Sequence, residues 1–197
     1  FANGCNFIDG MNGLTAFFML GSLLSCFFLT YIVNDYESGK LLILYGLALT
    51  GFISINYPWG KIFLGDSGSF LFALLIGIWV INFFGNNSTI SSWNVVLMFF
   101  YPTIEVLYSF VRKLCQGKSP FKADREHLHL KIFDTLKIRD SNPKLANNLT
   151  TIYLSFFWLS PSLFLPLVYD SNVLLFVTLT MLTISYLTIT IKIPATR

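Results

Sequence analysis

Long apolar runs, separated by short polar segments, are the main pattern along this chain of 197 residues. Each run approaches the length of about 20 residues that crosses a bilayer as a helix. Only one run carries a charged residue, Glu105. We expect membrane spans at residues 14–33, 41–57, 70–84, 93–111, 149–167 and 172–191. The pattern predicts an all-α fold, a polytopic integral membrane helical bundle with about six transmembrane helices.

Composition supports the membrane class. Hydrophobic residues make up 54% of the chain, charged residues 12%, and the mean hydropathy is +0.65. The three cysteines have unrelated spacings, which indicates neither a disulfide framework nor a metal knuckle. We expect a single membrane domain over residues 1–197. Because a polar cluster follows Phe1 directly and no initiator methionine precedes it, we expect the chain to be the C-terminal part of a longer protein.

Positive charge indicates the orientation. With six spans, the segments 1–13, 58–69, 112–148 and 192–197 share one side of the membrane, and every Lys and Arg except Lys40 lies on that side. By the positive-inside rule this side is cytoplasmic. Three unusual polar segments also fall on it, so we expect them to converge.

The N-terminal polar segment, residues 3–12, contains Asn3, Asn6, Asp9 and Asn12 at intervals of three. A helical turn would place several of these side chains on neighbouring faces. Amides both donate and accept, so they can bind a nucleobase or complete the oxygen shell of a cation. The alternative is a loop entering a helix, with Asp9 or Asn12 as the N-cap.

The Gly-Asp-Ser-Gly segment, residues 65–69, directly precedes an apolar run. A carboxylate at a helix start offers an oxygen ligand for Mg²⁺ beside N–H donors for phosphate. The alternative is an ordinary turn that caps a helix.

The basic loop, residues 112–148, holds nine of the thirteen basic residues. Lys122, Arg125, His127 and His129 form a cationic patch suited to a diphosphate or a lipid phosphate. A loop that touches anionic headgroups explains the Lys and Arg excess but not both histidines. A zinc pair is disfavoured because no third ligand of the same softness is near. The apolar period that follows predicts a short amphipathic helix at the membrane surface, at Leu128, Ile132, Phe133 and Leu136.

Glu105 is a carboxylate within an expected span, and such a residue is a functional hypothesis by default. It follows Pro102, so a structural bond to a neighbouring helix or to backbone freed at a Pro102 kink is an equally good interpretation.

Together these motifs resemble a known family. The sequence Asn-x-x-Asn-x-x-Asp-Gly-x-Asn-Gly, then Gly-Asp-x-Gly-Ser, then Asp-Arg-x-His-Leu-His, is similar to the polyprenyl-phosphate N-acetylhexosamine-1-phosphate transferases of glycosyltransferase family 4 type. It looks most like the bacterial branch that primes O-antigen (lipopolysaccharide), teichoic acid and related surface or cell-wall glycans. The resemblance is weaker to the peptidoglycan translocase, whose loop carries three successive histidines.

The resemblance implies transfer of an N-acetylhexosamine-1-phosphate from a UDP-N-acetylhexosamine to polyprenyl (undecaprenyl) phosphate, with release of UMP and dependence on Mg²⁺ or Mn²⁺. It implies a site on the cytoplasmic face of the bacterial inner membrane, with membrane lipids as partners, no nucleic acid and a homodimer left open. Carried over by position, the implied roles are catalytic for Asp9, Asp66, His127 and His129, metal-binding for Asp66 and Asn6, and substrate-binding for Asn3, Asn6, Asn12, Lys122 and Arg125.

Three features depart from the family pattern. Asn12 stands where many bacterial members have Asp, and Leu130 stands where a further His is frequent. An acidic motif that lies upstream in the family is not in this sequence. Two alternatives therefore remain beside the enzyme: a membrane transporter that uses Glu105, and a catalytically inactive family member.

Overall fold

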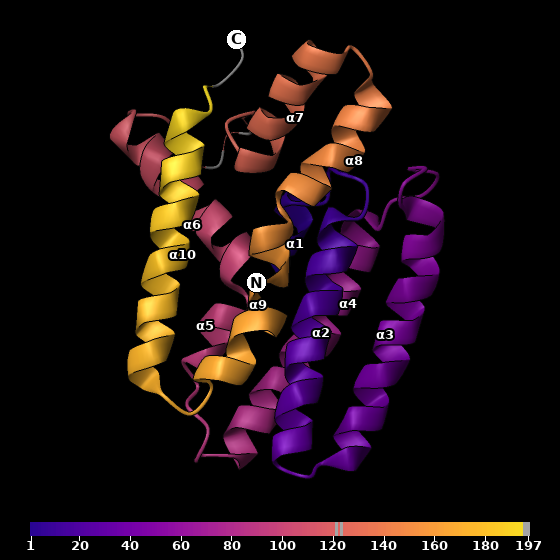
Figure 1. Ribbon diagram of the computed structural model, residues 1–197, viewed down its shortest axis with the longest axis vertical. Coiled ribbons are helices and arrows are strands. Elements are labelled where there is room, and N and C mark those ends of the chain that lie inside the picture. Colours follow the sequence, from indigo (N-terminus) through magenta and orange to yellow (C-terminus); the bar gives the residue numbers. More distant parts are fainter. Residues whose placement is uncertain (121, 123, 195–197) are drawn as a thin grey trace.

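The computed structural model describes residues 1–120, 122 and 124–194, and within these residues it is all-α, as the apolar pattern predicts. Its helices are shown in Figure 1. They are α1 (Ala2–Phe7), α2 (Leu14–Ile32), α3 (Tyr36–Asn56), α4 (Gly65–Asn86), α5 (Asn94–Met98), α6 (Phe100–Cys115), α7 (Leu128–Asp140), α8 (Pro143–Tyr153), α9 (Ser155–Val168) and α10 (Asn172–Lys192).

Five helical stretches in the described residues are long and apolar enough to cross a membrane: α2, α3, α4, the consecutive pair α8–α9, and α10. The expected span at 93–111 is different, because the chain breaks it at Phe99 into the short α5 and the longer α6. Pro102 lies in the first turn of α6, where its missing N–H and fixed φ are tolerated. The proline therefore marks the start of a helix rather than a kink within one.

The helices form a bundle in which α2 and α3 lie side by side and α9 packs between α2 and α10 (Figure 1). The short α1 contacts both α4 and α6, while α7 and α8 pair with each other at one end. Gly4 allows the close approach of α1 to α6, since a Cβ there would lie 2.8 Å from the carbonyl oxygen of Pro102. This approach seats the N-terminal polar segment within the bundle.

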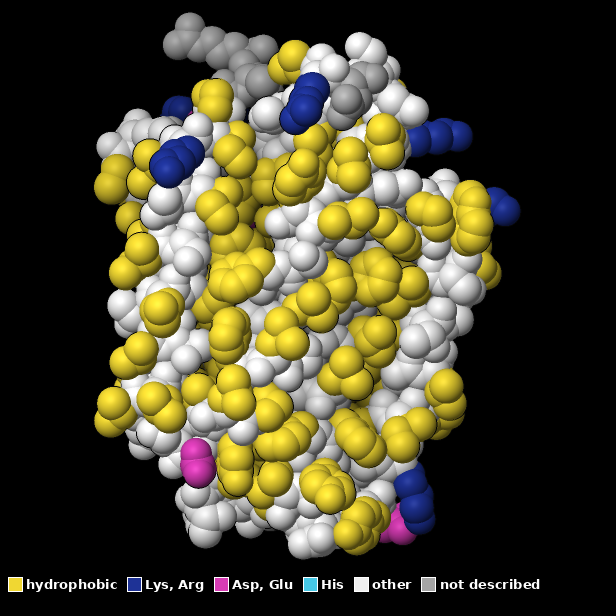
Figure 2. All heavy atoms as spheres, viewed as in Figure 1, with side chains coloured by type: hydrophobic (Ala, Val, Ile, Leu, Met, Phe, Trp, Pro, Cys, Tyr) yellow, Lys and Arg dark blue, Asp and Glu magenta, His cyan; other side chains and the backbone are white. Residues whose placement is uncertain are grey.

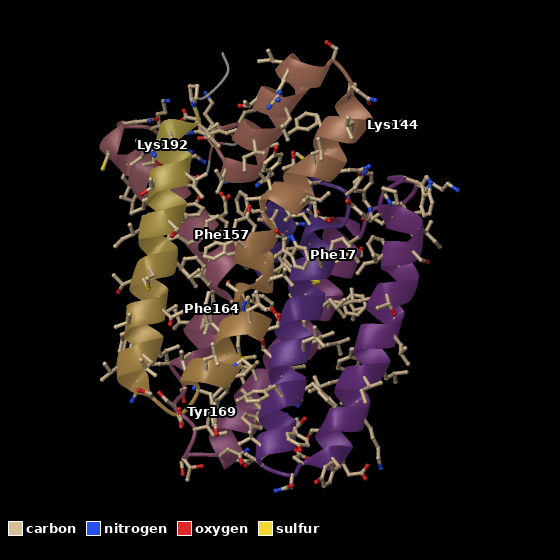
Figure 3. All side chains as sticks on the ribbon, in the orientation of Figure 1. Phe17, Lys144, Phe157, Phe164, Tyr169 and Lys192 are labelled. Carbon is tan, nitrogen blue, oxygen red and sulfur yellow. The ribbon has the colours of Figure 1, made fainter. Side chains whose placement is uncertain are left out.

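Large side chains fill the centre of the bundle. Phe157 lies in the interior (Figure 3), where its ring stacks with that of Tyr101 and meets that of Tyr186 edge-on. All three side chains are buried. This aromatic layer joins α6, α9 and α10.

Apolar and charged side chains divide the surface (Figure 2). Apolar side chains cover the sides of the bundle, and most visible Lys and Arg side chains gather at one end. We call this the basic end, and Figure 3 shows Lys144 and Lys192 there, with Tyr169 at the opposite end. Lys40, the one basic residue expected on the other side, forms a 2.6 Å ion pair with Glu37.

Candidate active site

The N-terminal polar segment and the Gly-Asp-Ser-Gly segment meet where α1 packs against α4. The Asn6 amide donates a 2.7 Å hydrogen bond to Asp66 Oδ1 and a 3.3 Å bond to Ser69 Oγ. Three residues later, Asp9 Oδ2 accepts a 2.8 Å hydrogen bond from the backbone N–H of Gly65. Two segments about sixty residues apart in the chain therefore share one polar cluster.

Negative charge is concentrated in this cluster. Burial raises the pKa of the Asp9 carboxyl, and the charge of Asp66 raises it further. Hydrogen bonds from Gly65 and Thr15 act in the opposite direction without cancelling the effect. Asp66 itself is exposed and lies in the first turn of α4, where the helix dipole favours a carboxylate. Two carboxylates that repel each other in this way form a site that attracts a cation.

The chemistry of these donors fits a magnesium ion. Mg²⁺ prefers carboxylate and carbonyl oxygens, keeps several waters and often takes only one or two carboxylates from the protein. Asp66 and Asp9 supply the carboxylates, and Asn6 retains a carbonyl oxygen because its amide nitrogen donates to Asp66. The described residues contain no group of three His, Cys, Asp or Glu side chains that could hold a metal ion. The magnesium site therefore stays a prediction that rests on the chemistry of Asp66, Asp9 and Asn6.

His127 and His129 lie at the start of α7 and are both buried, with 6% and 2% of their surfaces exposed. Glu105 of α6 lies between them and is 1% exposed. Its carboxylate is 3.1 Å from His127 Nδ1 and 3.9 Å from His129 Nδ1. The carboxylate singled out in the sequence, Glu105, therefore belongs to the same polar network as the histidines of the basic loop.

An aromatic contact links the histidines to the N-terminal polar segment. Phe7 lies at the end of α1, and the centroid of its ring is 5.5 Å from that of His127. Phe7 follows Asn6 directly, so His127 and the Asn6–Asp66 pair flank the same turn of α1. All three polar segments of the sequence thus converge at one region, as their shared side of the membrane predicted.

Ion pairs hold the basic loop against α6. Arg112 binds Asp124 at 2.9 Å and Glu126 at 3.0 Å. Burial raises the pKa of the Asp124 carboxyl. Hydrogen bonds from Arg112 and the Glu126 N–H lower it, as do the charges of Arg112 and Lys113. The lowering effects outweigh burial, so the pKa lies below its usual value. Arg112 therefore fixes the backbone immediately before His127.

The other cationic residues of the patch are more exposed. Arg125 pairs with Asp134 of α7 at 2.8 Å and keeps 66% of its side-chain surface exposed. Lys122 is also exposed, and its backbone carbonyl accepts a hydrogen bond from Lys113. These two side chains are accessible to an anion that approaches from the basic end.

Asn12 is in a different environment from the other residues of its segment. It is 5% exposed, and its side chain donates to Asn148 Oδ1 at 2.8 Å and to the Pro58 carbonyl at 3.3 Å. Its backbone N–H donates to Asn147 Oδ1 at 2.6 Å. Asn12 thus joins the start of α2 to α8, whereas Asn3 lies exposed on α1.

Sequence reasoning missed several residues that organise this region. Arg112 and the pair Asn147–Asn148 were not singled out, and the role of Glu105 was left open. The signals were weak: Arg112 is one of many basic residues in its loop, and the two asparagines look like ordinary polar residues before a span. Their partners lie far away along the chain, so no local pattern reveals them.

Comparison with known proteins agrees with the geometry. Residues 1–84, which carry both the N-terminal polar segment and Asp66, match the family model described as Glycosyl transferase family 4. Residues 1–84 of this chain belong to glycosyl transferase family 4. No solved structure gives a significant match to the chain.

Curated proteins similar to this chain include transferases whose names refer to polyprenyl phosphates. The chain is 30% identical over 148 residues to decaprenyl-phosphate N-acetylglucosaminephosphotransferase of Mycobacterium leprae, covering 64% of this chain and 37% of that protein. It is 31% identical over 127 residues to undecaprenyl-phosphate alpha-N-acetylglucosaminyl 1-phosphate transferase of Thermotoga maritima, covering 64% and 38%.

A more distant relative is phospho-N-acetylmuramoyl-pentapeptide-transferase of Streptococcus mutans, with 28% identity over 153 residues, 73% of this chain and 43% of that protein. The chain therefore spans less than half the length of these curated relatives. It is a multi-pass membrane protein that is similar to phospho-sugar transferases.

Proposed function

We propose that the protein containing this chain transfers an N-acetylhexosamine-1-phosphate from a UDP-sugar to a polyprenyl phosphate and releases UMP. The observation that carries this proposal is the convergence of three polar segments at one region, through the Asn6–Asp66, Asp9–Gly65 and Phe7–His127 contacts. A soluble donor and a lipid acceptor can meet only at a membrane surface, and α7, whose start carries the two histidines, lies at the basic end of the bundle (Figures 1 and 3). By the positive-inside rule that end faces the cytoplasm.

The reaction is a phosphoryl transfer. An oxygen of the lipid phosphate forms a bond to the sugar-linked phosphorus, and the bond from that phosphorus to the bridging oxygen breaks. UMP leaves with the bridging oxygen and its electron pair. Such a step depends mainly on positioning and on neutralising charge, because the protein takes no covalent part.

Each group of residues has a task in this proposal. Asp66 and Asp9, with the carbonyl oxygen of Asn6, would hold a Mg²⁺ ion, and Mn²⁺ has the same preference for oxygen ligands. A bound ion supplies charge neutralisation for the diphosphate. Arg125 and Lys122 attract the diphosphate, and the two histidines add ring nitrogens that can donate or accept a hydrogen bond.

The geometry of Glu105 weighs against the transporter alternative. An ion or proton site within a transporter needs a carboxylate that exchanges its partners during transport. Both oxygens of Glu105 are instead engaged by residues of α6 and by the start of α7. The carboxylate is therefore part of a fixed network.

The test uses the full-length protein in detergent or in liposomes. We expect release of UMP from a UDP-N-acetylhexosamine only when polyprenyl phosphate is present, together with a lipid-linked sugar diphosphate identified by mass spectrometry. A panel of UDP-sugars then assigns the donor. Absence of the lipid product with every donor, although the protein is folded, would contradict the proposal and favour an inactive relative.

A further inference from the structure

Glu105 is placed to act on the histidines of the basic loop rather than on a substrate. It is almost completely buried within α6, with 1% of its surface exposed. Its Oε2 atom lies 3.1 Å from His127 Nδ1. Its Oε1 atom accepts hydrogen bonds from the Leu128 backbone N–H at 3.1 Å and from the Tyr101 hydroxyl at 3.2 Å.

The two oxygens of Glu105 therefore have different tasks. The Leu128 N–H is at the start of α7, where backbone donors lack a partner within the helix, so Oε1 acts as a cap supplied by another helix. Oε2 acts on a side chain, His127. The first task is structural, whereas the second determines the state of a candidate catalytic residue.

The contact at Oε2 determines which nitrogen of His127 carries a proton. An ionised carboxylate only accepts hydrogen bonds, so the ring nitrogen beside it must be the donor. Nδ1 therefore bears hydrogen, and the opposite edge of the ring, Nε2, is turned away from Glu105. The neighbouring His129 is 3.9 Å from Glu105, beyond hydrogen-bond length, and its Nδ1 has no hydrogen-bond partner among the described residues. The constraint thus applies to His127 and not to His129.

We propose that Glu105 is a positioning residue that holds the His127 imidazole in one orientation, with Nδ1 protonated and Nε2 presented to the ligand. The assignment of that ligand as a hydroxyl group of a UDP-sugar, which can donate to Nε2, rests on the function proposed above, whereas the orientation of the ring does not. Buried partners of this kind fix both the tautomer and the direction of a histidine. Phe7 supports the arrangement from the other side, since its ring lies against that of His127.

The substitution Glu105→Gln separates the two tasks. Because the Leu128 N–H requires an acceptor, the glutamine must keep its oxygen at the Oε1 position and place its NH₂ group against His127 Nδ1. An NH₂ group cannot accept from Nδ1–H. We therefore expect the proton of a neutral His127 ring to move to Nε2, while the cap on α7 remains.

The first experiment is NMR of the full-length protein labelled with ¹⁵N-histidine, with the His127 signals assigned from their loss in His127→Asn. We expect a protonated Nδ1 at His127 in the wild type and a protonated Nε2 in Glu105→Gln, with His129 unchanged. Tyr101→Phe is the matched control, because it removes a contact to Oε1 but leaves Oε2 in place. An unprotonated Nδ1 in the wild type, or the same tautomer in Glu105→Gln, would overturn the inference. This readout needs no enzymatic activity.

The second experiment is a double-mutant cycle on UMP release. Partners that orient metal-bound histidines change activity by about 10- to 100-fold, and we expect a loss of similar size in Glu105→Gln, because a protonated Nε2 can no longer accept a hydrogen bond. In a His127→Asn background the same change should have little further effect, because its target is absent. Equal effects in both backgrounds would show a purely structural role for Glu105. If the wild type releases no UMP, the proposed function fails, and the tautomer measurement alone decides the inference.

Discussion

Asn6 donates a 2.7 Å hydrogen bond to Asp66 from sixty residues away in the chain. The bond joins α1 to the first turn of α4 and brings the second candidate carboxylate beside the segment that holds Asp9. The sequence marks both residues by type, but an amide on a short helix and an acidic residue at a helix start are both common, so the local sequence does not predict that they pair. The hydrogen bond between them makes the region a candidate site.

The close packing of α1 against α6 is the first feature to test. Gly4→Ala would place a Cβ 2.8 Å from the Pro102 carbonyl oxygen and 2.9 Å from its Cβ, which forces the two helices apart. Overpacking of this kind destabilises a protein by about 1–3 kcal/mol, and we expect UMP release to fall with it. The matched control is Gly10→Ala, because no atom lies within 4 Å of the Cβ it adds. Equal thermal unfolding of the two variants would contradict the packing described here.

The pH dependence of stability offers a second test. Burial, together with the charge of Asp66, raises the pKa of Asp9 in the folded protein. A carboxyl with a raised pKa binds its proton more tightly when folded, so its contribution to the free energy of unfolding falls as pH rises through that pKa. We expect Asp9→Asn to be more stable than the wild type at neutral pH and equal to it in acid. Thermal unfolding between pH 4 and pH 8 measures this difference.

Asp124 should show the opposite dependence of stability on pH, because its pKa is lowered and not raised. Although burial raises its pKa, Arg112, the Glu126 N–H and Lys113 together lower it. A lowered pKa stabilises the folded state above the unfolded pKa, and this contribution is lost as pH falls through the folded pKa. Asp124→Asn should therefore be less stable than the wild type at neutral pH and converge with it in acid. Two variants that respond to pH in the same direction would contradict the assigned environments.

Asn12 presents a choice between a structural and a substrate-binding role. Asn12→Ala removes the donors to Pro58 and Asn148. Both bonds are partly buried, and a typical hydrogen bond contributes about 0.5–1.5 kcal/mol to stability, so we expect lower thermal stability than in Asn3→Ala, which changes an exposed side chain. Unchanged stability with a raised KM for the UDP-sugar would instead assign Asn12 to substrate binding.

The sequence predicted the all-α membrane bundle because long charge-free runs have few other stable arrangements. It did not predict the break at Phe99, because residues 93–111 form a long run whose only charged residue is Glu105. Only the proline hinted at it, since Pro102 suits the first turn of a helix.

The sequence predicted which residue types form the candidate site and that they share one side of the membrane. It did not predict which side chains contact each other. Asp66, His127 and the amides stood out because such residues are rare in an apolar chain. The contact of Glu105 with His127 and that of Arg112 with Asp124 depend on how α6 meets the basic loop, and no local period encodes this. Long-range contacts of this kind require the fold.

The central claim is that Asp66 belongs to a site for phospho-sugar transfer, and the direct measurement is UMP release by the full-length protein with a UDP-N-acetylhexosamine and polyprenyl phosphate. Asp66→Asn keeps an acceptor for the Asn6 amide but removes the negative charge that a divalent cation requires. We expect its turnover to fall by about 100-fold or more, a loss typical of removing one key electrostatic group. Ser67→Ala, a change at the exposed neighbouring residue, should keep turnover near that of the wild type. Normal turnover in Asp66→Asn would contradict the account.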